Sequence, residues 1–383
     1  MVVSSNYNDN DRRCMRRGCM LFPELEVREA GWDCPQSSVF AVAYFRSRGG
    51  VGQKTDIHPP RPPSPLLFDH PRSAVSPLAV DSSNPPKKAW ACLLTGSPGY
   101  LSGFLTLHYS LRKHASKYPL IALLNPSDTL YPLFLSALQQ RGIPHRDIEA
   151  LRPVEDREFE GDPRFKECWT KLEMFGLYEF ERVGFLDSDM LVLQNMDELF
   201  EIPLEPHQIA ASAACVCNPR KRAHYPPTWI PENCAYSKQC YDPALAATAA
   251  TDAIPPTFGL GALNSGLVIL HPSPENYKRV TAPLSNPPLY RTFLFPDQDL
   301  LAHVFKGDWI PLPYVYNALK TLKGQHAEMW RDEEVKNLHF IIDKPWDDVD
   351  KKGEGKVLHG VWWGVDGERR EWEKGVYGIE SEE

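Results

Sequence analysis

Apolar segments and amphipathic segments alternate along the chain from Ala89 onward. Where apolar residues run together the pattern predicts strands, and where they recur with helical spacing it predicts helices. The predicted strands cover 89–96, 119–126, 184–193, the second half of 198–217, 262–273 and 335–348, and the predicted helices cover 100–118, 130–142, 165–183, the start of 198–217 and 296–305. Strands that alternate with helices are typical of βα units in a mostly parallel sheet. We therefore expect an α/β fold.

The first 88 residues differ from the rest in composition. Nine of the chain's 36 prolines fall between His58 and Lys88, which indicates an extended, disordered stretch. We expect a Pro-rich N-terminal extension over 1–88 and one domain over 89–383. Near the C-terminus, Trp362, Trp363 and Trp372 are expected to pack a short segment onto the core.

Charge and hydropathy exclude several classes of protein. The chain has a net charge of −8, and its first 88 residues carry 12 Lys and Arg against 9 Asp and Glu, which leaves −11 for the remainder. An acidic body disfavours nonspecific nucleic-acid binding. No run of eighteen apolar residues occurs, so no membrane span is predicted. The Arg-rich start lacks the apolar stretch of a signal peptide, and we expect a cytoplasmic protein.

The nine cysteines are odd in number and scattered. Cys215, Cys217, Cys234 and Cys240 are candidates for a four-thiolate zinc site, although their spacings fit no standard ligand pair. The sequence favours reduced cysteines in strands and loops.

Two aspartates one residue apart follow the apolar run of Val183 to Leu186. Asp187 and Asp189 should therefore lie at the carboxyl end of a strand, where open α/β sheets bind ligands. Paired carboxylates favour a divalent cation. His339 is a candidate third ligand and Lys344 a candidate cation for phosphate. Taken singly, each of these residues has a simpler interpretation: two solvated acids, a half-buried histidine and a surface lysine.

Six segments together resemble glycosyltransferase family 8, the family of glycogenin and galactinol synthase. They are "LTGSPGYLSGFLTLHYSLRKH", "TKLEMFGLYEFERVGFLDSDMLVLQNMDELF", "LNSGLVILHPS", "FPDQDLLAHVF", "PYVYN" and "HFIIDKPW", and they occur in the family's order over roughly 89–350. The resemblance implies a GT-A fold, which is a Rossmann-like sheet flanked by helices. It also implies a retaining, Mn²⁺-dependent transfer of a hexose from a UDP-sugar.

The resemblance also implies roles for individual residues. Asp187, Asp189 and His339 match the metal ligands, and Lys344 and Lys171 match lysines that contact the donor. The first and third segments match parts of the family that hold the nucleotide and the sugar. The implied donor-binding residues are Leu94, Thr95, Ser97, Tyr100, Ser188, Asn264 and Ser265, and the implied residues beneath the donor sugar are Asp297 and Gln298. Lys171, Asn264 and Asp297 could also have purely structural roles, as a helix-surface lysine, a turn residue and a helix cap, respectively.

Some positions depart from the family pattern. "HFIIDKPW" is shorter than usual between histidine and lysine, and Asp343 brings a negative charge near the expected phosphates. No tyrosine lies between Asn317 and His339, where glycogenin has its self-glucosylated tyrosine. A separate acceptor is therefore implied, and its identity stays open.

Two other functions remain possible from the sequence. One is a catalytically silent GT-A scaffold that binds nucleotide or glycan. The other is a phosphatase of the haloacid-dehalogenase type, with Asp187 as nucleophile and Asp189 as acid/base. The second is disfavoured because "GDWIPL" has Leu312 where that class needs an aspartate.

Overall fold

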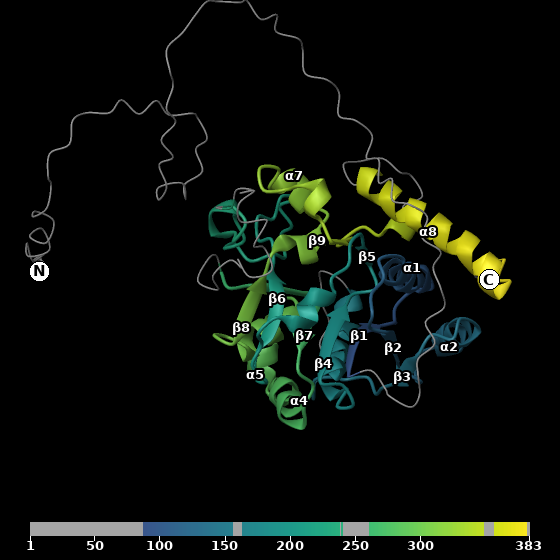
Figure 1. Ribbon diagram of the computed structural model, residues 1–383. Coiled ribbons are helices and arrows are strands. Elements are labelled where there is room, and N and C mark those ends of the chain that lie inside the picture. Colours follow the sequence, from purple (N-terminus) through teal and green to yellow (C-terminus); the bar gives the residue numbers. More distant parts are fainter. Residues whose placement is uncertain (1–86, 156–162, 238, 240–259, 348–355, 381–383) are drawn as a thin grey trace, which may run out of the picture. The chain divides into compact units, whose positions relative to one another are not determined.

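The structure is a computed structural model that describes residues 87–155, 163–237, 239, 260–347 and 356–380 (Figure 1). Of the predicted N-terminal extension, only Lys87 and Lys88 belong to these ranges. Residues 238 and 240–259, which include Cys240, also lie outside them.

The main sheet has seven strands in the described chain, in the order β3-β2-β1-β4-β7-β6-β8 (Figure 1). Neighbouring strands are parallel except where β7 runs antiparallel to β4 and β6. The strands are β1 (Lys88–Leu93), β2 (Leu120–Leu124), β3 (His145–Asp147), β4 (Arg182–Leu186), β6 (Ile209–Ala213), β7 (Leu263–Leu270) and β8 (Trp309–Leu312). The predicted α/β fold with a mostly parallel central sheet is confirmed.

Both faces of this sheet are covered. Side chains alternate along β1, so that Ala89 and Ala91 contribute to one hydrophobic core while Trp90 and Cys92 contribute to another. All four are fully buried. Burial on two faces explains why the strands appear in the sequence as continuous apolar runs rather than as an alternation of apolar and polar residues.

Helices and short 3-10 turns connect the strands. The α-helices are α1 (Gly99–Lys113), α2 (Tyr131–Gln140), α4 (Pro274–Thr281), α5 (Pro287–Tyr290), α6 (Pro296–Val304), α7 (Leu322–Gln325) and α8 (Lys356–Tyr377). The 3-10 segments are η1 (Pro163–Gly176), η2 (Asp197–Glu201), η3 (Pro231–Asn233), η4 (Ala282–Ser285), η5 (Tyr314–Tyr316), η6 (Asp332–Glu334) and η7 (Pro345–Asp347). Within the described ranges, none of the helices combines the length and apolarity needed to cross a bilayer.

The helix predicted over 165–183 differs from the observed structure. Its residues form the 3-10 turns of η1, which end at Gly176, and those from Arg182 onward belong to β4. The prediction was wrong for the last residues because parallel pairing of β4 with β1 decides their conformation, and helical periodicity does not reveal that pairing.

A second, three-stranded sheet positions the residues that follow β4. It consists of β5 (Met190–Val192), β10 (Asn337–His339) and β9 (Ala318–Leu319), in the order β5-β10-β9. In the antiparallel pair of β5 and β10, His339 lies opposite Met190. This register places His339 beside Asp189, although about 150 residues of sequence separate them.

The C-terminal segment forms the long helix α8, which packs against α1 (Figure 1). Trp362 is fully buried and contacts Trp346 at a centroid distance of 5.6 Å, whereas Trp363 is 38% exposed. The predicted packing of this segment onto the core is confirmed for Trp362.

Buried ion pairs tie α8 to the preceding helices. Asp366 accepts hydrogen bonds from Thr106 Oγ1 of α1 (2.8 Å) and from Arg369 (2.6 Å). Glu373 accepts from Arg369 and from Arg141, which follows α2, at 2.8 Å each. All five side chains are buried, so each charge depends on its partners for compensation.

We expect Asp366→Ala to lower the free energy of unfolding by about 3–5 kcal/mol, because it removes a partner of the fully buried Arg369. Urea unfolding of the full chain measures this loss. Glu368→Ala on the same helix is the matched control. Glu368 is half-exposed and pairs with Lys113, so its removal should cost at most about 1 kcal/mol. Equal losses in the two variants would contradict the prediction.

Candidate active site

A cavity of about 520 Å³ opens at the carboxyl end of β4, a volume within the range of about 300–1,000 Å³ found for small-molecule sites. Most of the residues singled out in the sequence line it, although they come from distant segments. They are Thr95, Tyr100, Lys171, Asp187, Ser188, Asp189, Asn264, Ser265, Asp297, Gln298, His339 and Lys344. Leu94 and Ser97 do not line it: Leu94 is buried in the core, and Ser97 is exposed in the turn before α1.

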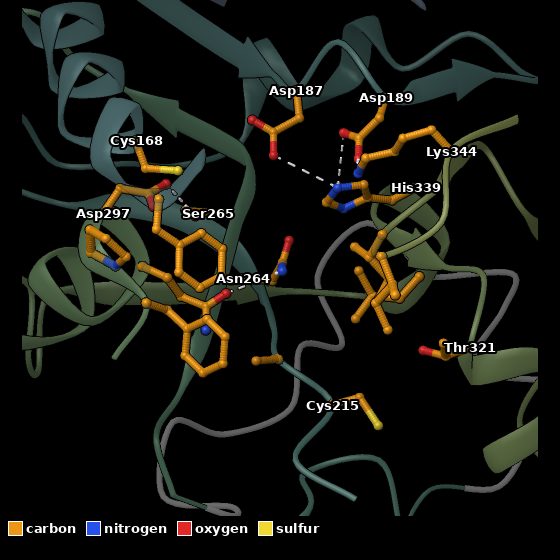
Figure 2. Close-up of a pocket in the computed structure, with 18 of the residues that line it drawn as sticks. Cys168, Asp187, Asp189, Cys215, Asn264, Ser265, Asp297, Thr321, His339 and Lys344 are labelled. Carbon is orange, nitrogen blue, oxygen red and sulfur yellow. Dashed lines mark hydrogen bonds and ion pairs between the residues drawn. The ribbon is translucent and has the colours of Figure 1, made fainter. Parts of the chain in front are cut away.

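Two carboxylates and one imidazole converge in this cavity (Figure 2). His339 Nε2 lies 3.3 Å from Asp189 Oδ1 and 3.7 Å from Asp187 Oδ2. One ligand atom from each residue lies within 4.8 Å of the other two. The backbone fixes this arrangement, since Asp187 N donates to Gly266 O on β7 (2.8 Å) and Phe340 N donates to Asp189 O (2.9 Å).

The ring of His339 is held in one orientation. Its Nδ1 lies 2.8 Å from Oδ1 of the fully buried Asn317, so Nδ1 donates to that oxygen and Nε2 faces the carboxylates. The other side of the ring lies against Gly266, where an added Cβ would collide with the imidazole. Glycine is thus required at position 266 for the close approach of His339.

Two lysines compensate the carboxylates. Lys171 Nζ lies 2.8 Å from Asp187 Oδ1 and 3.2 Å from Asp297 Oδ2, and Lys344 Nζ pairs with Asp189. Three carboxylates and two ammonium groups leave a formal charge of −1. This excess negative charge favours a further cation in the cavity.

Burial and pairing set the protonation states. Burial raises the pKa of Asp187, and Lys171 opposes that shift. Burial also acts to raise the pKa of Asp189, but Lys344 and His339 outweigh it and hold that pKa below its usual value. Burial acts to lower the pKa of Lys171, but Asp187 and Asp297 outweigh it and raise that pKa well above its usual value. Asp189 and Lys171 are therefore charged at neutral pH.

Amides and a hydroxyl form the side of the cavity next to β7. Ser265 Oγ donates to Asp297 Oδ2 (2.7 Å) and Asn264 Nδ2 donates to Gln298 Oε1 (3.2 Å). Figure 2 shows Asp297 and Ser265 across the cavity from His339 and Lys344. The alternative role of Asp297 as a helix cap is not seen. It lies inside α6, and Asp299 accepts the hydrogen bonds of the backbone before the helix.

The shortened segment between His339 and Lys344 closes through an unusual backbone conformation. Ile342 has φ +71°, a left-handed conformation that is costly for a β-branched residue. Asp343, whose charge the sequence placed near the expected phosphates, pairs with Arg220 at 2.7 Å, and Arg220 holds the pKa of Asp343 below its usual value.

The first of the six segments that resemble the family, "LTGSPGYLSGFLTLHYSLRKH", lies where α1 meets η7. Thr95 Oγ1 donates to Asp128 (3.0 Å), and the Tyr100 ring contacts Trp346 edge-on at a centroid distance of 5.2 Å. A Cβ at Gly99 or Gly103 would collide with Trp346. The glycines of α1 therefore allow the tryptophan that follows Lys344 to seat against this helix.

Two features of the cavity were not predicted. Asn317, within the "PYVYN" segment, links the site because it contacts both His339 and Asn264 (2.8 Å each). The second is an aromatic wall of Phe165, Tyr225, Trp229 and Phe295, in which Trp229 stacks on Phe295 at 4.9 Å. Its members lie on three separate segments, and only the structure brings them together.

Comparison with known proteins gives one family. Residues 91–350 match Glycosyl transferase family 8. Galactinol synthase 2 of Arabidopsis thaliana is 27% identical over 287 residues, which is 73% of this chain and 81% of that protein. Galactinol synthase 1 of Solanum lycopersicum is 26% identical over 285 residues, 72% of this chain and 81% of that protein.

Among solved structures, the WbbM bifunctional glycosyltransferase has a similar fold. It aligns with a TM-score of 0.50 at 15% identity, over 78% of this chain and 53% of the WbbM chain. The alignment thus spans less than two thirds of that longer chain, and at this identity it shows the fold alone.

The family match covers more than half of the chain and includes every segment that lines the cavity's carboxylate and amide sides. A phosphatase of the haloacid-dehalogenase type is therefore not supported. The chain belongs to glycosyltransferase family 8 and is a glycosyltransferase with the GT-A fold.

Proposed function

We propose that this glycosyltransferase transfers a hexose, glucose or galactose, from a UDP-sugar to a separate acceptor with retention of the anomeric configuration, in a Mn²⁺-dependent reaction. The observation that carries the proposal is the convergence of Asp187, Asp189 and His339 within 4.8 Å, beside two lysines in one cavity.

The set of ligand atoms on Asp187, Asp189 and His339 fits a divalent cation that prefers oxygen ligands. It offers carboxylate oxygens and one imidazole nitrogen, and oxygen-rich sets of this kind suit Mn²⁺. The formal charge of −1 in the cavity supports the same conclusion. When bound, such a cation supplies electrostatic stabilisation of a diphosphate.

In the proposed reaction the bond from the sugar to the UDP oxygen breaks, and negative charge develops on the leaving diphosphate. Lys344 is buried with its ammonium group in the cavity and would stabilise that charge. Lys171 bridges Asp187 and Asp297, so its main role would be to hold these two carboxylates in place.

The two ends of the donor would bind on different elements. Thr95, Tyr100 and Ser188 lie in the part of the cavity proposed for the nucleotide. The polar groups of Asn264, Ser265, Asp297 and Gln298 would hydrogen-bond the sugar, because their mutual bonds already fix them in position.

The acceptor would bind along the aromatic wall. Rings of Trp229 and Tyr225 line the cavity, and such faces suit the apolar side of a sugar or cyclitol. The relatives named galactinol synthase make UDP-galactose the first donor, and inositol the first acceptor, to test.

Release of UDP from a panel of UDP-sugars tests the donor site. Asp187→Asn and Asp189→Asn should each lower Mn²⁺-dependent release by roughly 10²–10³-fold, because each removes a charged group from the metal site. Glu368→Gln, on the surface of α8, is the control and should keep full activity. Mn²⁺-dependent binding of UDP without turnover of any sugar would indicate the silent scaffold, and no binding at all would reject the donor site.

Metal affinity tests the role of Asn317. Asn317→Ala should weaken Mn²⁺ binding in the presence of UDP by roughly 10–100-fold, because His339 loses the group that orients its ring. Titration calorimetry measures the affinity. Asn317→Asp keeps the acceptor oxygen and should bind more tightly than the alanine variant. Equal affinities for wild type and Asn317→Ala would show that the contact with His339 is irrelevant to the metal.

Steady-state kinetics test the aromatic wall. Trp229→Ala should raise KM for the acceptor roughly 5–10-fold, the loss expected for one stacking contact, while KM for the donor stays unchanged. Trp229→Phe should keep most of the acceptor affinity. Trp363→Ala removes an exposed tryptophan from α8 and should change neither constant. A change in donor KM alone would place Trp229 on the wrong side of the cavity.

A further inference from the structure

Three cysteines and one histidine meet at a second position. Sγ atoms of Cys215, Cys217 and Cys234 lie 3.5, 3.3 and 3.6 Å from Nε2 of His326. The four ligand atoms are all within 4.8 Å of one another. Cys217, Cys234 and His326 are buried and Cys215 is half-buried, so the group is largely screened from water.

These separations match a tetrahedral zinc site. Zinc binds sulfur at about 2.3 Å and histidine nitrogen at about 2.0–2.1 Å, which places sulfur and nitrogen ligands about 3.6 Å apart around one ion. The three observed separations are within a few tenths of an ångström of that value. A disulfide would join two of the sulfurs and leave the third without a role, and all three cysteines are free thiols.

The ligands come from three separate segments. Cys215 and Cys217 follow β6 directly, Cys234 is the residue after η3, and His326 is the residue after α7. His326 N is fixed by a hydrogen bond to Leu322 O (2.7 Å). From the sequence, a four-thiolate site with Cys240 was a candidate, and reduced cysteines in strands and loops were favoured. The structure instead supplies a histidine 92 residues beyond Cys234, while Cys240 lies outside the described residues.

We propose that Cys215, Cys217, Cys234 and His326 bind one structural Zn²⁺. Four protein ligands complete a tetrahedral shell, which is typical of structural rather than catalytic zinc. Soft thiolate ligands favour zinc over Mn²⁺, whereas carboxylate ligands suit hard cations such as Mg²⁺ and Mn²⁺. The chain therefore has two metal sites of different chemistry, and Mn²⁺ does not replace zinc in the second.

The position of the site indicates what the ion does. Residues 214–237 have little regular structure besides η3, yet they supply Arg220, Tyr225 and Trp229 to the cavity. Cys215 also lines the cavity, and Figure 2 shows it away from Asp187 and Asp189. Zinc would fix both ends of this segment to the chain after α7, and thereby hold one wall of the active site.

Zinc content of the full-length protein tests the proposal. Protein purified under reducing conditions without chelators should contain one zinc ion per chain, as measured by inductively coupled plasma mass spectrometry. Cys217→Ser and His326→Ala should lose it, whereas His326→Cys should keep it as a four-thiolate site. Cys92→Ala, a buried cysteine of β1, and Asp187→Asn should both keep one zinc. This readout needs neither a sugar donor nor turnover, so it is independent of the proposed function.

A measurement on the wild type covers the case in which the variants do not fold. Titration with a mercurial reagent should release one zinc as about three thiols react, and Co²⁺ in place of zinc should give the absorption of a tetrahedral thiolate complex. Wild-type protein without zinc, zinc retained in His326→Ala, or a disulfide between two of the three cysteines in reduced protein would each overturn the proposal.

Discussion

Buried charge is the constraint around which the cavity is organised. Asp187, Asp189 and Asp297 are held in a space with little access to water, where an uncompensated carboxylate is costly. Lys171 and Lys344 reduce that cost without removing it, since one negative charge remains. A site that retains a negative charge after its own lysines are counted is suited to a divalent cation that arrives with an anionic diphosphate. The same balance explains why both lysines are as buried as their partners.

The close approach of these groups depends on the backbone around them. β4 delivers the two aspartates to the edge of the main sheet, and the small sheet returns His339 to them through the pairing of β5 and β10. Gly266 leaves room for the imidazole, and Asn317 fixes which nitrogen it presents. A substitution at either of these two positions would displace His339 from the two aspartates.

Much of the fold could be predicted from sequence because the two patterns that indicate it, apolar runs and paired aspartates, are local. Apolar runs marked the strands, and the paired aspartates marked the end of β4. The end of the helix predicted over 165–183 was wrong because Arg182 and Val183 pair with β1, and sheet pairing outweighs helical periodicity. In the cavity, residues named from the family resemblance lie together, except that Leu94 points into the core and Ser97 to solvent. The orientations of those two side chains depend on packing, which a match in sequence does not specify.

The fourth member of the cysteine cluster, His326, could not be predicted for a different reason. Spacing rules for zinc sites assume that ligands come in close pairs on one or two turns, whereas this group draws its fourth ligand from beyond β7, α6 and β8. Only the folded chain brings His326 to the three thiols.

The two clusters of candidate metal ligands lie in different surroundings, and this difference has a physical reason. The oxygen-rich set lies at the end of a strand, where the sheet already provides rigidity and a cation has only to bind. The three cysteines lie on a segment with little regular structure besides η3, where a four-coordinate ion can replace the missing secondary structure. Rigid support on one side of the cavity thus comes from the sheet, and on the other side we infer that it comes from zinc.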